Sequence, residues 1–357
     1  MRLQMPPSVM NDAPDRLVKL MHLTSVQPAG KQRASRRLVG LLSVWLLAVG
    51  CFAAQSHDYV QSTRGDSKSW TALKWSADDI ALFGGVPEYR GNSQHLILVR
   101  YHFFVSSYDV DRMVPVWVAH VAEKDSELKD RGRTKGEFSR KDDHFAPDAN
   151  VVTYARSLRL PFATNDSFVN ANPPELPAGE KGYAKITRGH MASNREMKSL
   201  GDPVEGVQSQ KESFSLANVA PQMQHHNAPI WAKLEYDCIE WAAKIGRVAV
   251  ITGPVFAPDP ALPSPGNRIL FTTGKDGVRI PIPTHFFKVI IGTVYGKVSA
   301  VGFLVPHRAD LALSELKNFV VPIRRIEEIA GINFMPLLGA NDAIESVPNG
   351  DWLKMIR

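Results

Sequence analysis

Dense runs of apolar residues along the chain predict several strands and few long helices. Residues 95–104 (HLILVRYHFF) and 114–121 (VPVWVAHV) have the β-branched and aromatic content of strands. Residues 248–252 and 284–294 show the same pattern, and residues 213–219 predict a shorter strand. Because strands and helices are mixed without a regular strand–helix–strand alternation, we expect the α+β class.

Residues 227–246 predict an amphipathic helix. Apolar residues recur there at helical spacing and form one stripe: Ile230, Leu234, Cys238 and Trp241. Pro229 falls in the first turn, where its missing N–H costs little, and Gly246 ends the helix. Residues 320–331 predict a second, shorter helix near the end of the chain.

Polar segments divide the chain into parts. Residues 124–143 are strongly charged and are typical of a solvated loop, and residues 171–182 form a turn-rich connector. The sequence has no internal repeat. The organisation that we predict is a leader, a linker, one catalytic domain and a tail, at residues 1–54, 55–79, 80–340 and 341–357.

The bulk charge gives no support to a nucleic-acid partner. The 357 residues are 44% hydrophobic and 22% charged, which is ordinary for a soluble globular protein. Of the 42 basic and 36 acidic residues, seven and two lie in residues 1–53, which leaves 35 and 34 in the remainder. Because that remainder is nearly neutral, binding to a polyanion has to come from a local cluster of basic groups.

Residues 31–54 have the order of an export signal. Four basic residues (Lys31, Arg33, Arg36 and Arg37) precede an apolar run at residues 38–54 that ends in small residues. We expect the domain that follows to be exported, to the periplasm or the extracellular medium. Three fates of the leader stay open: cleavage near Ala53 or Ala54, retention as a membrane anchor through residues 38–54, and lipid attachment at Cys51.

Two segments carry candidate chemistry for hydrolysis of a phosphodiester. The first is residues 187–192 (TRGHMA), and the second runs from residue 213 to Asn227 and beyond. The reaction needs a base near neutrality, a cationic group for the phosphoryl oxygens and a stabiliser of the leaving oxygen. His190, Arg188 and the amide oxygen of Asn227 with a hard cation such as Mg²⁺ supply these three parts. On a strand, Arg188 and His190 would point to one face.

Taken singly, each of these residues has a simpler interpretation. His190 alone would be a structural histidine, and Asn227 before a proline is a good helix N-cap. Glu235 and Arg188 alone would be solvated surface charges. Glu235 also lies two helical turns beyond Asn227, roughly 12 Å along a regular helix, so it would act through a metal-bound water and not as an inner ligand. The functional interpretation therefore depends on the whole set.

The segment TRGHMASN resembles the Asp-Arg-Gly-His signature of the DNA/RNA non-specific endonuclease family, the endonuclease G-like ββα-metal nucleases. The resemblance continues through FSLANVAPQMQHHNAPIWAKLE, where the family has a strand, an Asn-x-x-Pro-Gln turn and a helix that runs from Asn to Trp and Glu. Six flanking pieces extend it over about residues 80–340: FGGVPEYR, PVWVAHV, FAPD, ITGPVF, PIPTHFFKVIIG and IEEIAGINF.

This resemblance implies a ββα-metal (His-Me finger) nuclease fold, with a mixed or antiparallel central sheet flanked by helices. It implies that His190 is the general base and that Asn227 is the direct ligand of Mg²⁺, with Mn²⁺ as an alternative. Arg188 would bind phosphate, and Glu235 would orient a metal-bound water.

The resemblance also assigns residues around this core. The family uses an upstream arginine before an aromatic residue and an Asp, and Arg140 is the best match, with Lys141 one residue away. Asn218 would brace the site. The family usually has Asp where this chain has Thr187, which keeps a hydrogen-bonding group but loses the charge and so bears on rate and metal preference.

The function that these observations predict is metal-dependent endonucleolytic hydrolysis of DNA and RNA with little sequence specificity. A nucleic-acid-binding protein of the same fold with impaired catalysis is the alternative, because of Thr187 and the nearly neutral charge. A phosphodiesterase for small nucleotides or lipid headgroups is a third hypothesis. No stable protein partner is predicted, a homodimer stays open, and membrane contact is expected only if the leader is retained.

Overall fold

The structure is a computed structural model, and its described residues all belong to one compact unit within residues 51–357. These residues are 59–63, 82–123, 145–168, 185–198, 203–260, 267–337, 343–346 and 350–356. Within these ranges no helix combines the length and the apolar character that a bilayer span requires. The predicted leader, the charged segment 124–143 and the connector 171–182 lie outside the described residues.

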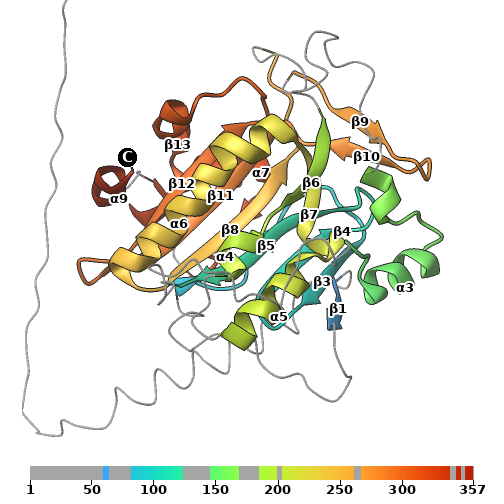
Figure 1. Cartoon of the computed structure of the whole chain (residues 1–357), viewed down its shortest axis with the longest axis horizontal. Coiled ribbons are helices and arrows are strands. Elements are labelled where there is room, and N and C mark those ends of the chain that lie inside the picture. The colour runs from blue at the N-terminus through green and yellow to red at the C-terminus, as the bar shows by residue number, and fades with distance from the viewer. Residues whose placement is uncertain are drawn as a thin grey trace, which may run out of the picture. The chain divides into compact units, whose positions relative to one another are not determined.

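A mixed eight-stranded sheet organises the described residues (Figure 1). Its spatial order is β1 (Tyr59–Thr63), β3 (Leu96–Arg100), β4 (Phe104–Asp109), β5 (Val114–Ala122), β8 (Val248–Val255), β11 (His285–Val294), β12 (Lys297–Pro306) and β13 (Val320–Val321). β1 pairs with β3 in parallel, and every other neighbouring pair is antiparallel. β1 falls inside the segment that was predicted as a linker.

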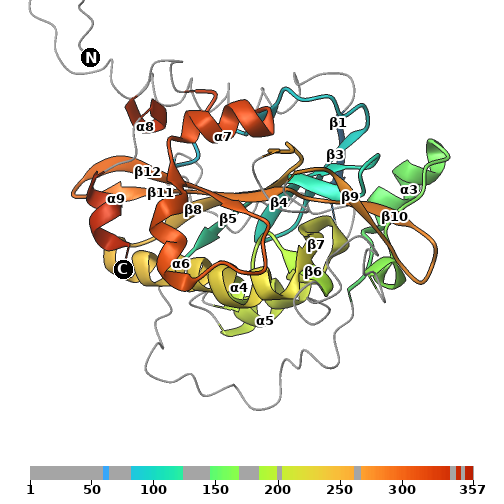
Figure 2. The ribbon, with the colours of Figure 1, turned by 90° about the horizontal axis from the view of Figure 1, so that it is seen from above.

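Helices cover both faces of this sheet (Figure 2). On one face lie α4 (Asn194–Lys198), α5 (Pro203–Ser213) and α6 (Ala232–Ile245), and α7 (Ile323–Ala330) lies on the other. Because side chains alternate along a strand, β5 sends Val118 into the core under α6 and Trp117 into the core under α7. The arrangement confirms the predicted α+β class with a mixed sheet flanked by helices.

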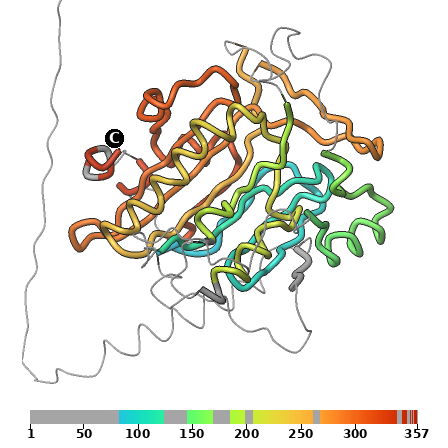
Figure 3. The backbone as a smooth tube through the Cα atoms, viewed as in Figure 1, coloured from blue at the N-terminus to red at the C-terminus, as the bar shows by residue number. Residues whose placement is uncertain are grey.

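Within the part of the chain that the structure describes, three two-stranded sheets supplement the main one. They pair β6 (Ile186–His190) with β7 (Val219–Met223), β9 (Leu270–Thr273) with β10 (Arg279–Ile282), and β2 (Glu88–Tyr89) with β14 (Ile332–Asn333). The other helical elements are α3 (Ala149–Ser157), η1 (Asn165–Phe168), η3 (Leu216–Asn218), η4 (His226–Trp231), η5 (Leu313–Phe319), α8 (Ala343–Ser346) and α9 (Gly350–Met355). Figure 3 shows β6 and β7 running side by side although η3, α4 and α5 separate them in sequence.

The strands predicted at residues 114–121, 248–252 and 284–294 are confirmed as β5, β8 and β11. The single strand predicted at residues 95–104 is wrong, because the chain turns at Tyr101, whose N–H donates to the carbonyl of Phe104, and so divides it into β3 and β4. The strand predicted at residues 213–219 is also wrong. Ser215 instead caps the helical turn η3, and β7 starts at Val219.

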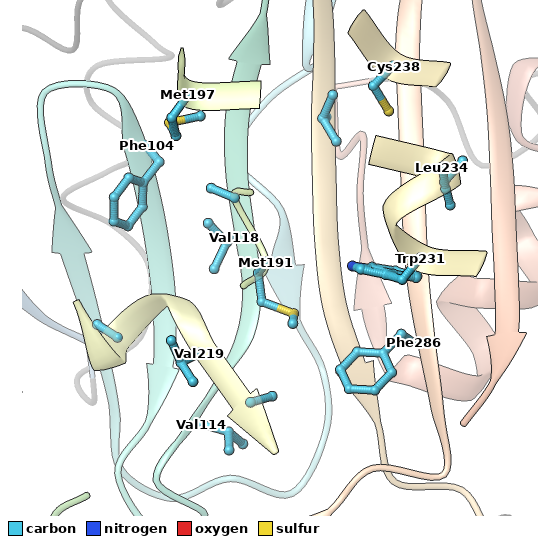
Figure 4. Packing of buried hydrophobic residues seen from close by; sticks show 14 of the residues in the cluster. Phe104, Val114, Val118, Met191, Met197, Val219, Trp231, Leu234, Cys238 and Phe286 are labelled. Atoms are coloured by element: carbon cyan, nitrogen blue, oxygen red, sulfur yellow. The ribbon is translucent and has the colours of Figure 1, made fainter. Parts of the chain in front are cut away.

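The helix predicted at residues 227–246 is confirmed over most of its length but begins differently. A π-helical turn, η4, precedes α6, and Asn227 lies inside this turn instead of capping it. Gly246 ends α6 with a positive φ of 92°. The stripe of apolar residues packs into the main core (Figure 4), where α9 adds Trp352 against Trp241.

Candidate active site

The β6–β7 ribbon carries the first candidate segment. Its antiparallel register pairs Thr187 with Gln222, Gly189 with Ala220 and His190 with Val219. Pro221 and Gln222, which the family resemblance assigned to a turn, therefore lie within strand β7. Beyond the ribbon the pairing continues into the loop, because the N–H of Met191 donates to the carbonyl of Asn218 at 2.9 Å.

His190 packs against a pair of aromatic rings at the end of β6, and the two rings also contact each other, with centroids 4.7 Å apart. The side chain of His190 is 7% exposed, and its ring centroid lies 5.1 Å from that of Phe145 and 5.5 Å from that of Phe214. Backbone hydrogen bonds fix the two phenylalanines together, since Ala146 N–H donates to the carbonyl of Phe214 and Leu216 N–H donates to that of Ala146. The three rings thus form one aromatic cluster that restricts the orientation of the imidazole.

Arg188 lies against the same ring as His190. Its guanidinium carbon is 4.8 Å from the centroid of Phe145, and one guanidinium nitrogen donates to the side-chain oxygen of Asn165 in η1. Burial lowers the pKa of Arg188, but arginine starts so far above neutrality that the group stays a cation. The expected common face of Arg188 and His190 therefore exists in the structure, with Phe145 as the shared contact.

Asn227 and Thr187 meet across the gap between the ribbon and the helix. The amide nitrogen of Asn227 is 3.5 Å from the hydroxyl oxygen of Thr187, and that hydroxyl donates to the carbonyl of Gln222 at 3.0 Å. The π-helical turn that holds Asn227 is closed by a bond from the N–H of Ala232 to the carbonyl of Asn227. Strand and helix are thereby joined at the residue where the family has a carboxylate.

Asn218 connects the ribbon to the loop that follows His190. Its buried side chain accepts from the N–H of Ala192 at 2.7 Å and donates to the carbonyls of Ala192 and Ser213 at 2.8 and 3.0 Å. These bonds satisfy backbone N–H and C=O groups of the loop that would otherwise need water as a partner. The amide therefore fixes the path of the chain directly after the imidazole.

A fully buried charged network lies under the site. Lys288 Nζ is 3.2 Å from one carboxylate oxygen of Glu196, whose other oxygen is 2.8 Å from Nε2 of His120. Burial favours a raised pKa for Glu196, but the charge of Lys288 and the contact with His120 outweigh it and lower the pKa to about 2. The ammonium of Lys288 also lies 5.5 Å from the Trp231 ring.

Glu235 lies on α6 and interacts electrostatically with Lys288 of this network. Burial works to lower the pKa of Lys288, but the carboxylate of Glu196 and, more weakly, that of Glu235 raise it. Glu235 is therefore close enough to Lys288 to affect it electrostatically. The η4–α6 helix, through Trp231, and helix α4, through Glu196, therefore both lie against the buried ammonium.

The donor set around Asn227 fits a hard divalent cation with few protein ligands. Since the amide nitrogen faces Thr187, the amide oxygen is the atom left for a cation. Among the described residues, His, Cys, Asp and Glu side chains form no group of three that would ligate a metal. One amide oxygen with water in the other positions is a coordination that Mg²⁺ accepts.

The structure thus assembles six of the seven predicted site residues around the β6–β7 ribbon and the η4–α6 helix. Arg140, like its alternative Lys141, lies outside the described residues. The sequence interpretation missed the three side chains that orient the predicted pair: Phe145, Phe214 and Asn165. Asn165 belongs to a segment without apolar periodicity, so nothing local to it marks a contact with Arg188.

Gly189 sits where a side chain has no room. A Cβ atom there would lie 2.2 Å from Oε1 and 2.6 Å from Cβ of Gln222. We expect Gly189→Ala to force β6 away from β7, to destabilise the fold by about 1–3 kcal/mol and to impair whatever activity Arg188 and His190 support. Thermal unfolding measures the first effect. The control is Gly350→Ala, where the space around a Cβ is open; a Gly189 variant as stable as this control would contradict the clash.

His307 anchors the end of β7 and predicts a sensitivity to acid. Its Nε2 accepts from the N–H of Met223 at 2.7 Å, and its Nδ1–H donates to the carbonyl of Pro283 at 2.8 Å. Burial lowers the pKa of His307 to about 4. An unfolded-state histidine titrates near 6.5, so the unfolded chain binds more protons between these values and the free energy of unfolding falls as the pH drops.

We expect the titration of His307 to lower the free energy of unfolding by about 3 kcal/mol as the pH falls from 6.5 to 4. Above pH 6.5 it should have no effect on stability. His307→Gln keeps one donor and one acceptor but does not titrate. Urea unfolding across this pH range should therefore show a shallower pH dependence in the variant than in the wild type. Equal slopes would contradict the neutral, buried state of His307.

Comparison with known proteins gives a consistent family assignment. A family model described as DNA/RNA non-specific endonuclease matches residues 87–341. The mitochondrial nuclease EXOG of Danio rerio is 30% identical over 262 residues, which cover 71% of this chain and 64% of that protein. Mitochondrial endonuclease G of Homo sapiens is 25% identical over 249 residues, which cover 69% of this chain and 72% of that protein.

A solved structure also aligns with the chain. It is the EndoG/EndoGI complex, at 22% identity and a TM-score of 0.49, over 74% of this chain and 94% of the matched one. The aligned region spans 60–64% of the length of the EXOG relatives.

Proposed function

The chain belongs to the DNA/RNA non-specific endonuclease family, and from this premise we propose that it is a metal-dependent nuclease. Its reaction would be endonucleolytic hydrolysis of phosphodiester bonds in DNA and RNA with little sequence specificity. The observation that carries the proposal is the single strand β6, on which Arg188 and His190 share the ring of Phe145 while Thr187 contacts Asn227 of the helix.

In this proposal His190 is the general base. It takes a proton from the attacking water while the water oxygen bonds to phosphorus and the bond to the leaving oxygen breaks. The packing of His190 against Phe145 and Phe214 supports this role, because an imidazole with a restricted orientation needs little reorganisation before it accepts the proton.

Arg188 would bind the non-bridging phosphate oxygens. Its contact with Asn165 occupies part of the guanidinium, and since no other hydrogen bond from it to a described residue is present, its remaining N–H groups would meet the anion. Arg140 is proposed as a second phosphate contact on the family resemblance alone.

Asn227 would hold Mg²⁺ or Mn²⁺ through its amide oxygen, with Glu235 orienting water around the cation. When bound, the cation supplies charge stabilisation for the phosphoryl group and the leaving oxygen. Thr187 contributes a neutral hydroxyl to this region, so it holds the Asn227 amide without adding to the charge of the site.

The test is metal-dependent cleavage by the purified full chain. We expect supercoiled plasmid and single-stranded RNA to be cut in Mg²⁺, the activity to stop in excess EDTA, and Mg²⁺ or Mn²⁺ to restore it. Asn227→Ala should raise the metal concentration for half-maximal cleavage by at least about tenfold, because it removes the proposed protein ligand. Asn333→Ala, an amide on β14 outside the site, should leave that concentration within about twofold.

Three outcomes would contradict parts of this proposal. Binding of nucleic acid without turnover in any metal would favour the impaired binding protein instead. Faster hydrolysis of small diesters than of polynucleotides would favour a different phosphodiesterase. Cleavage that resists EDTA would remove the metal from the mechanism.

We also propose that the domain is exported, on the basic, apolar and small-residue order of residues 31–54. Fusion of residues 1–54 to a reporter enzyme that folds only outside a bacterial cytoplasm tests this. An inactive reporter fusion would refute export by this segment.

A further inference from the structure

The β9–β10 hairpin carries an exposed pair of side chains to which the proposed catalysis assigns no role. Phe271 is 41% exposed, and the guanidinium carbon of Arg279 lies 4.6 Å from the centroid of its ring. The register places Phe271 opposite Pro281 and Arg279 opposite Thr273, so both side chains leave the same face of the hairpin. An exposed phenylalanine with an arginine against it is a ready surface for a flat, anionic ligand.

The opposite face of the hairpin is attached directly to the catalytic ribbon. Leu270 and Ile282 are buried in one small cluster with Ile186 and Met223, the paired residues at the end of the ribbon away from His190. In Figures 1 and 2 the hairpin accordingly lies beside β6 and β7. The exposed pair is thus carried by the same structural unit as Arg188 and His190.

A second attachment fixes the turn of the hairpin to η1. The backbone N–H of Lys275 donates to the carbonyl of Asp166 at 2.9 Å, and the carboxylate of Asp276 accepts from Thr164 and Ser167 at 2.6 Å each. Gly274 packs so closely on Ser167 that a Cβ atom would lie 2.3 Å from its Cα.

η1 is also the element whose first residue, Asn165, accepts the hydrogen bond from Arg188. The hairpin therefore reaches the proposed phosphate-binding arginine by two routes, one through β6 and one through η1. This double attachment fixes the exposed pair relative to Arg188.

The hairpin also carries more basic than acidic residues. Residues 267–282 include three basic residues and one acidic residue: Arg268, Lys275, Arg279 and Asp276. The carboxylate of Asp276 is hydrogen-bonded to η1 although the residue stays exposed, and Lys275 makes a long, exposed contact of 3.9 Å with Asp166. Because the chain beyond residue 53 is nearly neutral, this hairpin is a local cluster of the kind that polyanion binding requires.

We propose that Phe271 and Arg279 form a subsite for a single-stranded stretch of the polynucleotide substrate, a proposal that rests on the proposed nuclease function. An unpaired base would stack on Phe271, and Arg279 would contact the adjoining phosphate. A base inside a duplex keeps its faces stacked on its neighbours, so the ring of Phe271 selects for unpaired bases. Arg279 would contact only the phosphate backbone, so it would contribute to the binding of single-stranded and duplex substrates alike.

The experiment measures binding without cleavage, by fluorescence anisotropy of labelled oligonucleotides with the full chain in EDTA. We expect Phe271→Ala to weaken binding of a single-stranded oligonucleotide about 5–100-fold and binding of a duplex of the same length by less than about twofold. Phe271→Tyr should restore single-strand binding. The control is Tyr295→Ala, an aromatic residue that is 85% exposed in the turn between β11 and β12, which should leave both affinities unchanged.

The charge contribution has its own readout. Arg279→Ala should weaken binding to both oligonucleotides and reduce the slope of log affinity against log salt by about 0.7 for the single strand. Arg279→Lys should keep that slope, because the charge remains.

The outcomes separate this subsite from the nuclease assignment. If the wild type binds and cuts single strands and Phe271→Ala binds them equally well, the subsite is refuted and the proposed function stands. If Phe271→Ala loses single-strand and duplex binding to the same extent, the stacking subsite is refuted as well. If the wild type neither binds nor cuts polynucleotides, the proposed function fails and the subsite with it.

Discussion

Replacement of His190 by alanine is expected to lower kcat/KM for plasmid cleavage by about 10²–10⁴-fold, the contribution of a positioned general base. The variant keeps Arg188, Asn227 and the cation, so substrate binding should change much less than kcat. The rate falls because the variant lacks the general base that accepts the proton of the attacking water. Initial rates at saturating Mg²⁺ measure it.

Two controls separate this loss from a loss of structure. His190→Gln keeps a side chain packed against Phe145 and Phe214 but supplies no base, so its rate should fall as far as that of His190→Ala. His95→Ala removes a partly exposed histidine that pairs with Asp111 outside the site and should leave the rate within about twofold. A folded His190→Ala protein with wild-type kcat/KM would overturn the assignment of the base.

Lys288→Met is expected to reduce the free energy of unfolding by about 3–5 kcal/mol, the cost of leaving a buried charge without its partner. Glu196 and Lys288 have no exposed surface, and the charge of Lys288 is the largest of the influences that lower the pKa of Glu196 to about 2. Without it, burial and the neutral state of His120 leave the carboxylate poorly stabilised. Because each kcal/mol shifts the midpoint of thermal unfolding by about 2–4 °C, we expect this midpoint to fall by on the order of 10 °C.

A double-mutant cycle tests whether the pair is the cause. Glu196→Gln removes the carboxylate but keeps an amide that can bond to His120 and to the N–H of Ser193. The double variant should be more stable than the sum of the two single losses predicts, because neither charge is then left alone. Strict additivity would show that the two residues do not depend on each other.

The fold was predictable where the signal is local. β5, β8 and β11 are buried on both faces and read as continuous apolar runs, so their residues alone identify them. The turn at Tyr101 was not predictable in this way, since its aromatic neighbours are as apolar as a strand. β1 was missed because a polar segment becomes a strand only when an edge such as β3 is present to pair with it.

The site was predictable as a set of residue types but not as a geometry. The spacing of Arg188 and His190 on one strand gave their common face. Phe145 and Asn165 come from other parts of the chain, and their contacts with Arg188 depend on how η1 and the strands fold together. Asn227 shows the limit most clearly, because its position before Pro229 suits an N-cap, whereas tertiary packing draws it into a wider turn.

That wider turn makes the number of residues between Asn227 and Glu235 matter as much as their identity. A π-helical turn accommodates one residue more than the α-helical turn that it replaces. If His226–Trp231 rewound as ordinary α-helix without losing a residue, every side chain upstream, Asn227 included, would swing by about 100° around the axis. Homologues with the same segment length must therefore keep the π-helical turn to hold Asn227 in place, and a homologue with one residue fewer should have an ordinary α-helical turn there instead.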